Sequence, residues 1–95
     1  MHALTWEEFE GTEGVSAWQV DSEGGPCVEM TLKRAIQLPA TGRAGGSFRL
    51  EFQGPFEPIL PQAIYRFRSG DACHDIFIVP VARDDDGTLY EAVFN

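Results

Sequence analysis

The chain has few basic residues: seven lysines and arginines stand against fifteen aspartates and glutamates, which gives a formal net charge of −8. A surface with this excess of negative charge repels phosphate backbones and anionic membranes. We therefore expect neither a nucleic-acid nor a membrane partner, and we expect any protein partner to be neutral or basic. The alternative is that the charge only keeps the protein in solution.

Cysteine and histidine are also scarce, with two of each in the chain. Cys27 and Cys73 lie far apart, and the N-terminal residues have neither the basic nor the apolar stretch of a secretory signal. We expect a cytoplasmic protein whose thiols are reduced, buried and inert, although the sequence leaves open whether the two cysteines pair. No apolar run approaches the roughly 20 residues that span a membrane as a helix.

The sequence lacks a set of residues that would support catalysis. A catalytic nucleophile needs a base beside it and a third group that orients the base. Cys73, His74 and Asp75 come closest, but neighbours along a strand point to opposite faces, so these residues cannot form a dyad by themselves. We expect a buried Cys73 and an exposed His74, no cofactor and no enzymatic activity.

Metal-binding patterns are weak as well. Cys27, Cys73 and His74 are too few for a zinc site unless acidic residues join them. The run 84–87, three aspartates and a glycine, suggests calcium, but a calcium-binding loop has its glycine at the sixth position and a glutamate at the twelfth. We interpret this run as a hairpin turn, with weak calcium binding as the alternative, and predict no metal site.

Most of the chain alternates apolar and polar residues with the period of two that is typical of β-strands. Clusters of glycine, proline and aspartate separate these stretches. We predict about six strands, at residues 15–20, 27–38, 47–53, 64–68, 75–81 and 88–94. The protein is then mostly β, a small antiparallel barrel or sandwich that forms a single domain over residues 1–95.

The residues before the first strand carry a helix start. Thr5 and Glu8 are spaced as a capping box, in which each side chain accepts from the backbone N–H of the other residue. This predicts one short helix over residues 6–10, ended by Gly11.

The second predicted strand has a register that can be tested. Met30 and Leu32 share one face and are expected to be buried, whereas Glu29 and Thr31 share the other and are expected to be exposed. The alternation changes phase near residues 33–34, which predicts a β-bulge there.

Five large apolar residues are candidates for contact with a partner. Both tryptophans belong either to the core or to a flat aromatic platform for a sugar or a proline-rich segment. Residues 55–62 carry three prolines, which limit the entropy lost on binding, and this segment either closes one end of the barrel or meets a partner. The candidates are Trp6, Trp18, Phe56, Ile59 and Leu60.

Three stretches of the sequence together resemble a small uncharacterised bacterial domain family of about this length. They are LTWEEFEG at 4–11, FQGP and LPQ within 52–62, and the final IVPV, RD and YEAVFN within 78–95. Members of that family are often encoded beside phage-tail-like fibre or collar proteins. The resemblance implies a structural or protein-interaction domain, accessory to such an assembly. A module that binds a small ligand or a carbohydrate is the alternative.

Overall fold

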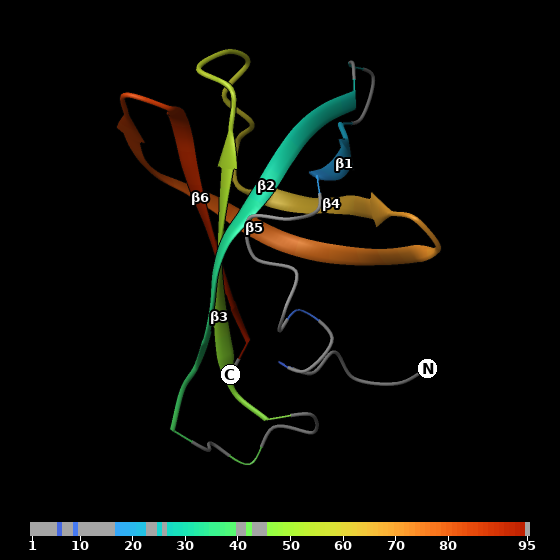
Figure 1. Ribbon diagram of the computed structural model, residues 1–95, viewed down its shortest axis with the longest axis vertical. Helices are drawn as coiled ribbons and strands as arrows, with labels where there is room; N and C mark the ends of the chain where they lie inside the picture. Colours follow the sequence, from blue (N-terminus) through green and yellow to red (C-terminus); the bar gives the residue numbers. More distant parts are fainter. Residues whose placement is uncertain are drawn as a thin grey trace.

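Six strands form a closed antiparallel barrel in the computed structural model, in the order β1-β2-β3-β6-β5-β4 (Figure 1). The structure describes Trp6, Phe9 and residues 17–22, 25, 27–39, 42 and 46–94. The strands are β1 (Ala17–Asp21), β2 (Cys27–Gln37), β3 (Phe48–Gly54), β4 (Ala63–Ser69), β5 (Ala72–Asp84) and β6 (Gly87–Phe94). The predicted mostly β fold and the number of strands are confirmed. Within the described ranges, no helix is long and apolar enough to cross a membrane.

The barrel interior is filled by every second residue of the strands, as the alternating sequence predicts. In β3, for example, Phe48, Leu50 and Phe52 have no exposed surface, while the residues between them are half-buried on the outer side. Aromatic residues are the largest side chains of this core. Its largest members include Tyr90, Phe9, Phe48, Phe52, Phe67 and Met30.

Strand β2 has the predicted register. Met30 and Leu32 are fully buried, Glu29 is exposed and Thr31 is half-buried. The pairing of β2 with β3 shifts between Leu32 and Arg34, so the predicted bulge is confirmed.

Strand β5 is longer than the predicted strand 75–81 because it belongs to two pairings. Residues 72–78 pair with β4, and residues 79–84 pair with β6. The register of the second pairing shifts between Pro80 and Ala82. Proline has no backbone N–H to donate within a sheet, and such an irregularity is one of the places where a strand tolerates it. Figure 1 shows the result: β4 and β5 run across the long axis that β2, β3 and β6 follow.

Phe9 lies in the barrel core, among residues of β1, β3 and β5. Its ring is fully buried, with centroids 5.9 Å from Trp18, 6.0 Å from Phe48 and 5.6 Å from His74. Its backbone N–H donates to the carbonyl oxygen of Trp6, in a 3₁₀-type turn. The other residues of the helix predicted over 6–10 lie outside the described residues, which contain no α-helix.

The proline-rich connection between β3 and β4 closes one end of the barrel through a single residue. Leu60 is buried, and its backbone N–H donates to the hydroxyl oxygen of Tyr90 at 2.9 Å. Phe56 and Ile59 remain exposed. The interpretation of this segment as a barrel plug therefore holds for Leu60 but not for the other two side chains.

Candidate functional site

Large apolar side chains are exposed on three neighbouring strands: Ile64 on β4, Phe77 and Val81 on β5, and Val93 on β6. Ile64 of β4 and Phe77 of β5 are directly paired. Val93 lies on the neighbouring strand β6, two residues beyond Glu91, whose pairing with Val79 is the last between β5 and β6. We call Ile64, Phe77 and Val93 the apolar row.

Ion pairs border the apolar row on both sides. Arg66 and Asp75, the next outward pair of β4 and β5, have their Nε and Oδ1 atoms 3.4 Å apart. Arg49 of β3 pairs with Val93, and its guanidinium lies 3.5 Å from Glu51 and 3.9 Å from Glu91. A partner that covers the row would therefore meet an apolar centre with a charged rim, which is the usual anatomy of a protein–protein interface.

A hollow of about 850 Å³ opens beside Ile64. It is lined by the end of β1, by the connection before β4 and by the start of β4; its lining includes Asp21, Leu60, Pro61, Ile64 and Asp75. Its size lies in the range of roughly 300–1,000 Å³ that is common for ligand-binding clefts. The hollow and the apolar row share Ile64.

An arginine–carboxylate pair joins β1 to β4 at the rim of this hollow. The guanidinium of Arg68 donates from Nη2 to Asp21 Oδ1 at 2.7 Å and from Nε to Oδ2 at 3.0 Å. The hydrogen bond and the charge of Arg68 lower the pKa of Asp21, although partial desolvation opposes them, and the same pairing raises the pKa of Arg68. Asp21 thus stays ionised at neutral pH.

The five side chains singled out from the sequence lie in three separate environments. Trp18 and Leu60 are buried in the core. Trp6 is half-buried, and its indole N–H donates to the carbonyl oxygen of Ala35 at 3.0 Å. Phe56 and Ile59 are exposed on the β3–β4 connection. The two tryptophans therefore do not form an exposed platform.

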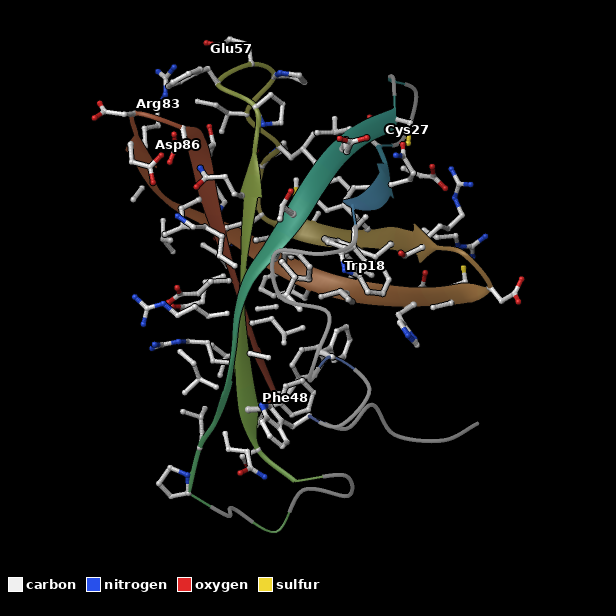
Figure 2. The ribbon with its side chains drawn as sticks, in the orientation of Figure 1. Trp18, Cys27, Phe48, Glu57, Arg83 and Asp86 are labelled. Carbon is white, nitrogen blue, oxygen red and sulfur yellow. The ribbon has the colours of Figure 1, made fainter. Side chains whose placement is uncertain are left out.

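Phe56 belongs to a small cluster at one end of the barrel. The guanidinium carbon of Arg83 lies 5.6 Å from the centre of the Phe56 ring, and its Nη2 lies 3.9 Å from Glu57. Figure 2 shows Glu57, Arg83 and Asp86 together at this end, where the β3–β4 connection meets the β5–β6 turn. These contacts are exposed and contribute little to stability.

The structure corrects both expectations for the Cys73–Asp75 run. Cys73 is exposed, in phase with the outward Asp75 and Phe77, whereas His74 is half-buried, in phase with the inward Ile76. The His74 ring packs against Phe9 and Trp18, with centroids 5.6 and 6.1 Å away. Thiol and imidazole thus point to opposite sides of β5, as the strand geometry requires.

Cys27 is exposed too, which contradicts its predicted burial. It begins β2 at an outward position, and its thiol donates to the side-chain oxygen of Gln19 at 3.1 Å. Both cysteines are free. The residue type favours burial, but here the position in the strand decides the environment.

The aspartates of the β5–β6 connection form a hairpin turn, as interpreted from the sequence. Asp84 Oδ1 accepts hydrogen bonds from the backbone N–H of Asp86 at 2.9 Å and from Gln53 Nε2 at 3.2 Å. The first of these contacts is the main reason why the pKa of Asp84 is lowered. Gly87 follows with φ 138°, and a Cβ there would clash with the Gly54 carbonyl oxygen. The described residues contain no group of three potential metal ligands.

The apolar row was not singled out from the sequence, although it left a signal there. Ile64 is out of phase with the inward Tyr65 and Phe67, and Phe77 is out of phase with Ile76 and Ile78. An apolar residue at an outward position of an alternating strand has to be explained by something other than the barrel core. What the sequence does not reveal is that Ile64 and Phe77 lie directly opposite each other on neighbouring strands.

Residues 4–94 match a family model described as "Domain of unknown function (DUF6916)". The match spans nearly the whole chain, and the chain belongs to this family. The resemblance to a small domain family is confirmed at that level. No curated protein and no solved structure matches the chain.

Proposed function

We propose that this member of the DUF6916 family is a protein-interaction domain without enzymatic activity, which docks on its partner through the apolar row. The observation that carries the proposal is the exposure of Ile64, Phe77 and Val93, at 67%, 51% and 46%. The barrel interior is filled without them, so folding does not require apolar residues there. Covering such side chains with a partner removes apolar surface from water.

The charge of the protein defines the chemistry of the partner. With a net charge of −8, the domain attracts a neutral or basic protein, whereas it repels nucleic acid and anionic membrane surfaces. The ion pairs that flank the apolar row would then give orientation rather than affinity.

The two exposed thiols support a reducing location. Free, accessible cysteines persist in the cytoplasm but are prone to oxidation outside the cell. We therefore place the proposed interaction in the cytoplasm. In keeping with the resemblance described from the sequence, we extend the proposal to an accessory role in a phage-tail-like assembly, whose parts are put together there by protein–protein contacts.

A photo-crosslinking amino acid at position 77, introduced in living host cells, tests the proposal. We expect one or a few adducts of defined mass, each containing a neutral or basic protein. The matched control carries the crosslinker at Asp85, an exposed position on the β5–β6 turn. Equal adducts at both positions, or none at position 77, would contradict docking through the apolar row.

The alternative function, binding of a small ligand or a carbohydrate, rests on the hollow beside Ile64. Its volume is suitable, but neither tryptophan lines it, and the side chain of its aromatic lining residue, Tyr65, is buried rather than presented as a flat platform for a sugar. Titration of the ¹⁵N-labelled protein with a panel of monosaccharides and disaccharides separates the two functions. Saturable shifts confined to residues 60–66 would favour the alternative.

A further inference from the structure

One edge of strand β4 is only partly paired. On one side, β4 pairs with β5 along its whole length, from Ala63 to Ser69. On the other side, β1 pairs with Arg66, Phe67 and Arg68 only, and its last residue, Asp21, lies opposite Arg66. Residues 63–65 therefore have no strand on that side among the described residues.

The hairpin geometry shows which backbone groups face this open edge. β4 and β5 are joined by the two-residue turn Gly70–Asp71, and the residues that flank such a turn form a hydrogen-bonded pair. Hydrogen-bonded and non-hydrogen-bonded pairs then alternate along the hairpin. Counting back from Ser69 and Ala72, Ile64 and Phe77 form a non-hydrogen-bonded pair.

The backbone N–H and C=O of Ile64 consequently point away from β5, toward the side on which β1 has ended. Positions 66 and 68 have the same orientation, and both lie opposite residues of β1. Ile64 is the next position in this series. Within the described part of the chain, no hydrogen bond to its backbone occurs on that side.

The open edge faces the hollow of about 850 Å³, which has room for a short extended segment. We propose that this segment is a strand from the partner protein, which adds to β4 beside Ile64 and continues the sheet where β1 stops. Addition of a strand to an exposed edge satisfies the donor and acceptor of Ile64 together. This inference rests on the proposed interaction function and specifies its binding mode.

The lining of the hollow indicates the composition of the added strand. Leu60, Pro61 and Ile64 offer an apolar side, and the charged lining residues are two carboxylates, Asp21 and Asp75, and one guanidinium, Arg66. Each of these carboxylates has one arginine partner, but the protein as a whole is strongly acidic. Alternating apolar and basic residues fit this edge best, because successive side chains of a strand point to opposite sides.

A synthetic hexapeptide, acetyl-Lys-Val-Lys-Val-Lys-Val-amide, is a direct probe of this edge. We expect it to shift the amide signals of residues 63–66 and to slow hydrogen exchange at the Ile64 amide in the wild-type protein. The acidic counterpart, in which glutamate replaces each lysine, should bind at least tenfold more weakly. Unchanged exchange at Ile64 with saturating peptide, or shifts confined to other strands, would overturn the inference.

Two substitutions at one position separate strand addition from simple apolar contact. Ile64→Pro removes the outward N–H without removing a hydrogen bond to β5, because Ile64 does not donate to that strand. Ile64→Thr keeps the N–H and lowers the apolar area. We expect the peptide affinity to fall at least tenfold in I64P and to change less than threefold in I64T, after circular dichroism has confirmed that both variants fold.

Equal peptide affinity in I64P and the wild type would overturn strand addition, and so would an equally large loss in I64T. If I64P does not fold, the hydrogen exchange of Ile64 in the wild-type protein decides the matter. Crosslinking from position 77 remains independent of these results. Adducts at position 77 without peptide binding would leave the interaction function standing and remove only its proposed mode.

Discussion

Asp21 and Arg68 form an ion pair across the β1–β4 seam, the strand pairing with the fewest residues in the barrel. Two contacts of 2.7 and 3.0 Å join the last residue of β1 to the last outward residue of β4. The arrangement is bidentate, the strongest geometry for an arginine–carboxylate pair. Both side chains are partly exposed, so solvent screens the interaction.

Replacement of Asp21 with asparagine is expected to make stability less dependent on pH. The hydrogen bond from Arg68 lowers the pKa of Asp21 below the ordinary value of an aspartate, so the pair stabilises the folded state fully at pH values above the unfolded pKa. This contribution is lost as the pH falls through the folded-state pKa. The Tm difference between wild type and D21N should thus be small and positive at pH 7 and should shrink toward zero at pH 2.

The exposed Asp85 provides the control for this experiment. Asp85→Asn removes the same charge from the β5–β6 turn, away from the β1–β4 seam. Its Tm difference from wild type should be smaller at pH 7. A D21N difference that grows as the pH falls would show that the sign of the Asp21 contribution is wrong.

Both thiols are expected to react in the native protein. Cys27 and Cys73 are free and exposed, so an aromatic disulfide reagent should label two equivalents per chain without denaturant. The Cys27→Ser and Cys73→Ser variants should each retain one equivalent. Labelling that requires urea would contradict the exposed positions.

The barrel was predictable because its strands alternate with few exceptions. Phe48, Leu50 and Phe52 are inward in the structure as the period of two requires. The bulge in β2 was predictable for the same reason, since Ala35 disturbs the alternation. A strand with one buried face fixes its own register, so local sequence carries this information.

Contacts between remote segments could not be predicted in the same way. That β1 pairs with only three residues of β4 depends on two segments more than 40 positions apart, and the open edge at Ile64 follows from it. The burial of Cys73 was misjudged because cysteine is usually a buried residue, whereas this position lies in phase with the outward Asp75 and Phe77 of β5.

Removal of the Tyr90 hydroxyl is expected to destabilise the barrel through one unsatisfied donor. In Tyr90→Phe, the backbone N–H of the buried Leu60 loses its acceptor, at a cost of about 1–3 kcal/mol. The matched variant is Tyr65→Phe, whose hydroxyl donates to the carbonyl oxygen of Pro61 at 2.6 Å. Because Pro61 is exposed, water can replace that contact, and the loss should be smaller. Urea unfolding of both variants measures the difference, and equal losses would contradict the explanation.

Phe9 is expected to contribute more to stability than any exposed aromatic residue. Its fully buried ring packs between Trp18, Phe48 and His74. Phe9→Ala should lower the free energy of unfolding by about 3–5 kcal/mol, because it removes apolar burial and leaves a cavity. Phe56→Ala, on the exposed β3–β4 connection, should cost less than about 1 kcal/mol, the value of its contact with Arg83. Urea unfolding at a low temperature keeps both variants folded at the start of the titration. A loss for F9A as small as that for F56A would show that the segment carrying Phe9 is not part of the cooperative barrel.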